Sequence, residues 1–235
     1  MATRRAPVPE PVDRRRLVIR QALSVGVATG AYGVSFGALS VAAGLSLWQT
    51  MALSLLLFSG GSQFALVGVV AAGGTGVAAV LTSSLLGVRN GLYGLQVSRL
   101  LDVRGWRRAA AAQVTIDEST AVAIGQEQRR ESRLGFWLTG LSVFVLWNLM
   151  TLVGGVIGDL LGDPKRWGLD AAAAAAFLAL LWPRLKAREA QAVGVSAALV
   201  ALLVAPHAPA GVPVLVAALA AVVVGLWPRA KGGRR

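Results

Sequence analysis

Long apolar runs alternate with short charged blocks along this chain. The longest run covers residues 21–88 and contains no Asp, Glu, Lys or Arg. As a helix at about 1.5 Å per residue it would extend roughly 100 Å, enough to cross a hydrocarbon core of about 30 Å three times. Two further uncharged runs cover 134–158 and 190–228. A water-soluble domain needs charge on its outer faces, so the pattern predicts a polytopic integral membrane protein.

The apolar runs have the character of helices. They lack the alternation of apolar and polar residues that strands of a membrane β-barrel show over about ten residues. Hydrophobic residues make up 55% of the chain, which also contains 28 glycines, and both values are typical of helical membrane proteins. We predict an all-α fold, a helical bundle with about seven hydrophobic segments. These segments are 17–45, 48–72, 76–98, 134–161, 167–183, 190–206 and 211–228.

Most of the charge lies at the ends of these segments. The formal net charge is +12. Basic residues form blocks within 14–20, 99–108, 129–133, 184–188 and 229–235. Because Lys and Arg beside a span retain a loop in the cytoplasm, this placement explains the charge without nucleic-acid binding. We expect residues 1–15 to be a disordered basic cytoplasmic tail, 16–229 a single transmembrane domain, and 230–235 a second basic cytoplasmic tail.

The basic blocks conflict with a simple count of crossings. The N-terminus and the 99–108 block both favour the cytoplasm, whereas three crossings between them would place them on opposite sides. Either the sequence at 58–64 breaks a helix and makes a re-entrant element, or the mixed stretch at 109–128 also crosses. A weak similarity between 44–58 and 162–180 favours two structural repeats with broken helices, an arrangement that many transporters have.

Few residues of this chain are suited to catalysis. It has no cysteine and one histidine, His207, which excludes disulfides, a thiolate nucleophile and a metal centre with several histidines. A G-x-S-x-G sequence at 33–37 lies inside an apolar segment and not on a strand–turn–helix, so we interpret its glycines as packing residues. No phosphate-binding G-x-x-x-x-G-K-[ST] loop occurs. We expect no enzyme, no cofactor and no metal site.

Glycines recur at helical spacing in two segments. They occupy positions 26, 30, 33 and 37 in the first segment, and 154, 158 and 162 in and just after the fourth. Small residues let helix backbones approach closely where no hydrophobic effect drives helices together. The pattern indicates close helix packing, with a substrate path along some of these glycines as the alternative.

The first candidate site is the sequence Gly60-Gly61-Ser62-Gln63. Paired glycines weaken a helix and free backbone amides and carbonyls, which membrane proteins tolerate only inside protein or beside a wet cavity. Gln63 adds an amide that could hydrogen-bond a polar ligand. Two interpretations stay open, a structural kink and a substrate-binding site.

The second candidate is the pair Arg89-Asn90, inside the segment 76–98. An arginine in the middle of a span costs about 2.5–3.5 kcal/mol on insertion scales unless it pairs, snorkels or faces water. We therefore expect a functional or pairing role for Arg89. Its candidate partners are Asp117, Glu118 and Asp170.

The acidic candidates each have a second interpretation. Asp117 and Glu118 could belong to an amphipathic surface helix, or form a carboxylate site for a coupling proton or a substrate ammonium. Asp170 stands near the expected start of a helix, where a carboxylate also favours the helix dipole.

Five short sequences, in this order, resemble the AzlC family, the large subunits of branched-chain amino acid permeases. They are Tyr32-Gly-Val-Ser-Phe-Gly37, Phe58-Ser-Gly-Gly-Ser-Gln-Phe-Ala65, Val88-Arg-Asn-Gly-Leu-Tyr-Gly94, Thr115-Ile-Asp-Glu-Ser119 and Gly168-Leu-Asp-Ala-Ala172. The resemblance covers roughly residues 15 to 230. Two places depart from the family pattern. Arg89-Asn90-Gly91 stands where the family has Asn, Arg and His, and Ile116 separates Thr115 from Asp117.

The resemblance implies export of branched-chain amino acids (valine, leucine, isoleucine) with a small AzlD-type membrane subunit as partner. We expect a multi-pass, ion-coupled secondary transporter in the bacterial inner membrane, with its N-terminus in the cytoplasm. A transporter of another small substrate and a non-transporting membrane scaffold or assembly protein are the alternatives, and an oligomer is left open. From the residues themselves, we expect two groups at the site. The substrate-binding residues are Gly60, Gly61, Ser62, Gln63, Arg89 and Asn90, and the coupling or ammonium-binding acids are Asp117, Glu118 and Asp170.

Overall fold

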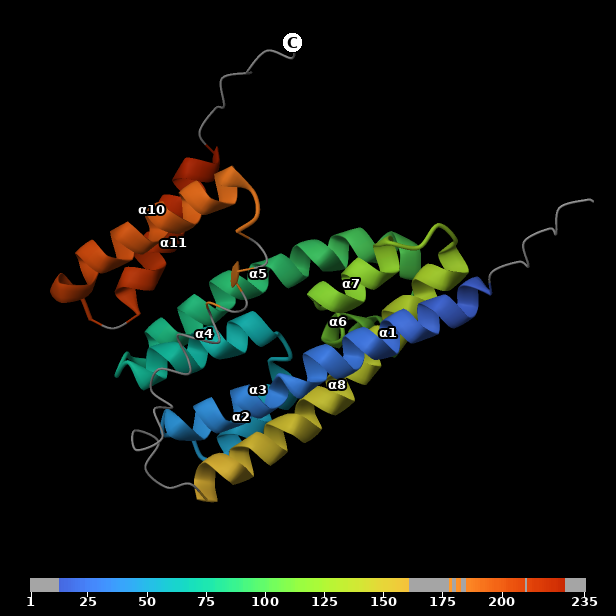
Figure 1. The fold of residues 1–235 in the computed structure, drawn as a ribbon, viewed down its shortest axis with the longest axis horizontal. Coiled ribbons are helices and arrows are strands. Elements are labelled where there is room, and N and C mark those ends of the chain that lie inside the picture. Colours follow the sequence, from blue (N-terminus) through green and yellow to red (C-terminus); the bar gives the residue numbers. More distant parts are fainter. Residues whose placement is uncertain (1–12, 161–177, 179–180, 183–184, 210, 227–235) are drawn as a thin grey trace, which may run out of the picture.

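The computed structural model describes residues 13–160, 178, 181–182, 185–209 and 211–226. Within these residues every regular element is helical, as predicted (Figure 1). The elements are α1 (Arg14–Ala31), α2 (Gly33–Ala42), α3 (Leu47–Leu56), α4 (Gly60–Ala71), α5 (Gly76–Leu101), α6 (Trp106–Gln113), α7 (Asp117–Ile124), α8 (Arg129–Leu160), α10 (Arg188–Val204), the 3-10 turn η3 (Ala205–His207) and α11 (Val212–Leu226). The predictions for Asp170, for most of 167–183 and for the tail at 230–235 lie outside the described residues.

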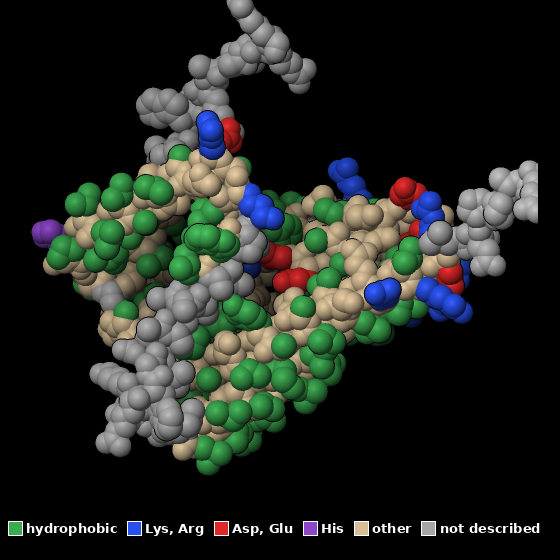
Figure 2. Space-filling model, in the orientation of Figure 1, with side chains coloured by type: hydrophobic (Ala, Val, Ile, Leu, Met, Phe, Trp, Pro, Cys, Tyr) green, Lys and Arg blue, Asp and Glu red, His purple; other side chains and the backbone are tan. Residues whose placement is uncertain are grey.

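Three helical stretches among the described residues are long and apolar enough to cross a membrane. They are Arg14–Ala42, which joins α1 and α2, Arg129–Leu160, and Arg188–His207. The 26-residue α5 has sufficient length, but Arg89 and Asn90 interrupt its apolar sequence. Hydrophobic side chains cover the outer face of the bundle (Figure 2). These features support an all-α membrane protein, although they do not confirm seven spans or two repeats.

The predicted break in the second apolar segment is present. Residues 57–59 separate α3 from α4, which have 10 and 12 residues. Each is therefore about half as long as the ~20 residues that a spanning helix needs. α3 begins with a capping box formed by Ser46 and Gln49, and leads into the middle of the molecule (Figure 1). From there α4 leads back out, so the pair is re-entrant, the first of the two arrangements considered above.

A second pair of short helices enters from the opposite end. α6 and α7 have eight residues each, so this part of the chain is too short to cross. Ser119 holds the turn between them, because its hydroxyl donates to the Val114 carbonyl (2.7 Å) and accepts from the Ile116 amide (3.0 Å). Gln113 Nε2 donates to the Leu55 carbonyl at the end of α3 (2.7 Å). The turns of the two pairs therefore meet in the middle of the molecule.

This arrangement removes the conflict over the basic blocks. α1 and α2 run from one end of the molecule to the other, α3 and α4 return to the end at which they entered, and α5 runs back to the first end (Figure 1). The arginines at the start of α1, after α5 and at the start of α8 consequently gather at one end of the molecule (Figure 2).

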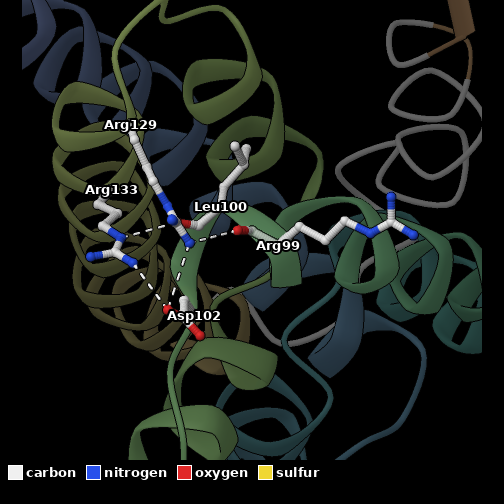
Figure 3. Close-up of polar contacts among 5 residues, drawn as sticks. All are labelled: Arg99, Leu100, Asp102, Arg129 and Arg133. Carbon is white, nitrogen blue, oxygen red and sulfur yellow. Dashed lines mark hydrogen bonds and ion pairs between the residues drawn. The ribbon is translucent and has the colours of Figure 1, made fainter.

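At this basic end, two arginines of α8 close the C-terminus of α5 (Figure 3). Arg129 Nη2 donates to the Arg99 carbonyl (2.9 Å) and Arg133 Nε to the Leu100 carbonyl (3.0 Å). Both guanidinium groups also face Asp102, at 3.7 and 4.0 Å. The last carbonyls of a helix lack partners within the helix and attract cations, so these contacts stabilise the junction of α5 and α8.

The glycines at helical spacing make the closest contacts between helices, which confirms the packing interpretation. A Cβ built on Gly37 would lie 2.1 Å from the carbonyl oxygen of Thr151 in α8. A Cβ built on Gly154 would lie 2.0 Å from the carbonyl oxygen of Val34 in α2. Gly33 also faces α8, whereas Ser35, between Gly33 and Gly37, is exposed. The glycines of the G-x-S-x-G sequence therefore bring two backbones together.

We predict that Gly37→Ala destabilises the protein by about 1–3 kcal/mol, the usual cost of overpacking, because α2 and α8 would have to separate. Thermal unfolding of the purified protein in detergent measures this. Gly91→Ala on α5 is the control, since a Cβ there meets nothing within 4 Å and alanine is favoured over glycine inside a helix. A Gly37→Ala protein as stable as the Gly91→Ala protein would contradict the packing role.

Candidate functional site

A cavity of about 430 Å³ lies where the turns of the two short-helix pairs meet. This volume falls within the range of about 300–1,000 Å³ that is typical of small-molecule pockets. One part of the lining is polar or charged and comprises Ser59, Gly60, Gly61, Arg89, Asp117 and Glu118. The larger apolar side chains of the lining include Phe58, Phe64, Ile116, Val143 and Trp147. Acidic side chains are visible in the middle of the view in Figure 2, away from the basic end.

The start of α4 forms one wall of the cavity. Ser59 is its N-cap, in an extended conformation, and Gly60 and Gly61 supply the first helical amides. The first N–H groups of a helix have no acceptor within the helix, and the helix dipole adds partial positive charge there. Both α4 and α7 begin in the middle of the molecule and run outwards in opposite directions (Figure 1). The cavity therefore lies beside two helix N-termini.

Arg89 of α5 lies between these two N-termini. Its Nη1 is 2.8 Å from Asp117 Oδ2 of α7, and the two side chains are 29% and 21% exposed. A Cβ built on Gly61 would lie 2.9 Å from Arg89 Nη2, so only glycine lets the guanidinium approach α4 this closely. Of the partners considered for Arg89, the structure places Asp117 beside it. Because Arg89 is paired with Asp117, it is not an isolated charge within an apolar segment.

Asp117 and Glu118 are the first two residues of α7, and both line the cavity. Both residues are half-buried, and their role as a carboxylate site stays a prediction. Carboxylates at a helix N-terminus are stabilised by its dipole. Asp170, the third acid considered, lies outside the described residues.

The other candidate residues do not line the cavity. Ser62 is fully buried and its hydroxyl lies 3.1 Å from that of Ser59. Gln63 is also fully buried, and its Nε2 donates to the Leu53 carbonyl near the end of α3 (3.0 Å). Gln63 thus adds a second hydrogen bond to a carbonyl near the helix break, which also accepts from the Leu57 amide (3.0 Å). Asn90 is half-buried beside Arg89, and its Oδ1 has no hydrogen-bond partner among the described residues.

Sequence reasoning did not identify the apolar wall. Phe58 and Ile116 come from the two turns, and Val143 and Trp147 come from α8. One signal was available, because tryptophan prefers the membrane–water interfaces and Trp147 stands in the middle of an apolar segment. The other residues look like ordinary core positions in a sequence.

Comparison with known proteins gives the chain its family. Residues 24–161 match the family model described as AzlC protein. A protein of Archaeoglobus fulgidus described as an uncharacterized membrane protein is 30% identical over 194 residues, which cover 82% of this chain and 85% of that protein. No solved structure matches the chain. The family match covers the re-entrant pairs, Arg89 and both acids of the cavity, and the chain belongs to the AzlC family.

Proposed function

We propose that this protein is a secondary transporter subunit that exports branched-chain amino acids across the bacterial inner membrane. Membership of the AzlC family and a membrane-protein relative support a role in membrane transport. The observation that carries the proposal is the cavity itself. It combines helix N-termini, an Arg–Asp pair and an apolar wall in the middle of a helical membrane protein. A small zwitterion with an aliphatic side chain has the complementary groups.

The substrate carboxylate binds at the start of α4. The amides of Gly60 and Gly61 and the guanidinium of Arg89 are the donors there. Transporters with interrupted helices recognise anionic groups at helix N-termini in the same way. Arg89 is shared between the substrate carboxylate and Asp117, which lies 2.8 Å from it.

The substrate ammonium binds to the carboxylates of α7, and the aliphatic side chain packs on the apolar wall. Glu118 lies next to Asp117 on the same cavity. A carboxylate that holds either the substrate ammonium or a proton makes the binding of one depend on the release of the other. This supports transport driven by an ion gradient, in the simplest case a proton gradient. Ser62, Gln63 and Asn90 stabilise this site from positions next to it that do not line the cavity.

The proposed protein works in the inner membrane with a small AzlD-type subunit. The basic end formed by the starts of α1 and α8 and the end of α5 faces the cytoplasm, following the positive-inside rule. This orientation puts the N-terminus in the cytoplasm.

Efflux of a preloaded branched-chain amino acid, from cells that make the chain with and without the partner, tests the function. Export that depends on both subunits supports a two-component permease. A folded, inserted protein that exports no branched-chain amino acid in either case would overturn the substrate assignment. Export of a different small molecule in the same assay would favour the alternative transporter.

We predict that Arg89→Gln and Asp117→Asn each lower export at least tenfold and destabilise the protein by up to about 3 kcal/mol, because each leaves a partly buried charge without its partner. The double variant should regain much of the stability but not the export. Efflux and thermal unfolding are measured together. Asp102→Asn is the control, since this exposed aspartate also faces arginines but lies outside the cavity. Full export by the double variant would contradict the role of the pair.

We also predict that Gly61→Ala weakens the apparent affinity for substrate severalfold while changing stability by less than about 0.5 kcal/mol. The added Cβ would displace only the flexible end of Arg89. Export rate as a function of substrate concentration reports the change. In the control, Gly87→Ala, the Cβ meets only the Ser62 hydroxyl at an ordinary 3.6 Å. Equal kinetics for the two variants would show that the position of the guanidinium does not matter.

A further inference from the structure

Trp147 is the largest side chain that lines the cavity, and the binding of the substrate's charged groups does not use it. It comes from the middle of the 32-residue α8 and is 4% exposed. Since tryptophan prefers membrane–water interfaces, its place halfway along a span requires a local reason.

Aromatic neighbours and a close helix contact hold the indole in place. Its ring stacks on Phe36, with centroids 6.0 Å apart and 25° between the planes, and stands perpendicular to Phe64 at 6.2 Å. The Trp147 carbonyl faces Gly33, where a Cβ would come within 2.5 Å. A ring held against two aromatic neighbours, on a backbone without room to shift, forms a rigid wall.

This wall stands beside the start of α4. A Cβ built on Gly60 would lie 3.5 Å from Trp147 Cη2, so the ring edge lies close to the first helical residue, with room for about one methyl group between them. In an α-amino acid the carboxylate and the side chain are bonded to the same carbon. A carboxylate held at the first amides of α4 therefore directs the side chain onto the adjacent wall, which Phe58 and Val143 continue.

We propose that Trp147 limits the length of the substrate side chain, so that the cavity accepts branched aliphatic side chains and excludes aromatic and longer ones. The inference rests on the proposed function, since it assumes an amino-acid substrate held by its carboxylate at α4. Trp147 determines specificity and leaves the recognition of charge to Arg89 and the acids.

Trp147→Phe is the variant of choice. The indole Nε1 has no hydrogen-bond acceptor among the described residues, so phenylalanine removes bulk without removing such a bond. Trp137→Phe is a matched control on the same helix. Trp137 packs against Phe136 at 5.5 Å in a separate cluster and does not line the cavity.

The experiment measures binding of valine, leucine, isoleucine, methionine and phenylalanine to the purified full-length proteins, alone and together with the small partner subunit, by ligand-induced thermal stabilisation. In Trp147→Phe, the affinity for methionine and for phenylalanine, each divided by the affinity for valine, should rise about tenfold. One methylene in an apolar pocket commonly produces a discrimination of this size. Trp137→Phe should keep the wild-type order.

The outcomes separate this inference from the function on which it rests. A folded Trp147→Phe protein with the wild-type order, or one that binds every ligand equally more weakly, would overturn the role of Trp147 alone. A wild-type protein that binds none of these amino acids, either alone or with the partner subunit, would overturn the proposed function as well. If Trp147→Phe does not fold, Trp147→Tyr, which is closer in bulk, gives the same comparison.

Discussion

Two helical segments break inside an apolar bundle, and the backbone groups freed at each break have to be satisfied by protein. A membrane interior offers no water for this purpose. Ser119 donates to the Val114 carbonyl, and Gln113 of one pair donates to the Leu55 carbonyl of the other. Gln63 adds a second hydrogen bond to the Leu53 carbonyl, which already accepts from the Leu57 amide. These side chains let α4 and α7 begin in the middle of the molecule. The cavity depends on this, because its polar lining consists largely of the residues at these two starts.

A rigid frame surrounds the two breaks. α1 and α2 pack on α8 through glycines, at which the facing atoms of α8 leave no room for a Cβ. At the basic end, Arg129 and Arg133 join the start of α8 to the end of α5. Arg14 pairs there with Glu127, and the hydrogen bond and charge of this arginine lower the pKa of the Glu127 carboxyl. The frame consists mainly of long helices, while half of the residues that line the cavity come from the short helices and their turns.

The sequence predicted the features that have a local cause. Paired glycines indicated the break at α4, and the cost of an unpaired arginine in a span indicated a partner for Arg89. The choice of Asp117 as that partner depends on where α7 lies, which no spacing reveals. The break before α7 was not recognised because Ser119, and not glycine or proline, stabilises its turn. Gln63 has the right chemistry for a ligand, but its amide is used inside the protein.

The half-length helices also constrain how the protein is made. α3 and α4 are each too short to be stable as independent spans, and the chain emerges from its N-terminus first. α1, α2, α3 and α7 all pack against α8, which is synthesised after them. Until α8 is in place, the glycine faces of α1 and α2 and the turns of the short pairs have no surface to cover them. The cavity therefore cannot form before α8 is inserted, because Val143 and Trp147 of this helix belong to its lining.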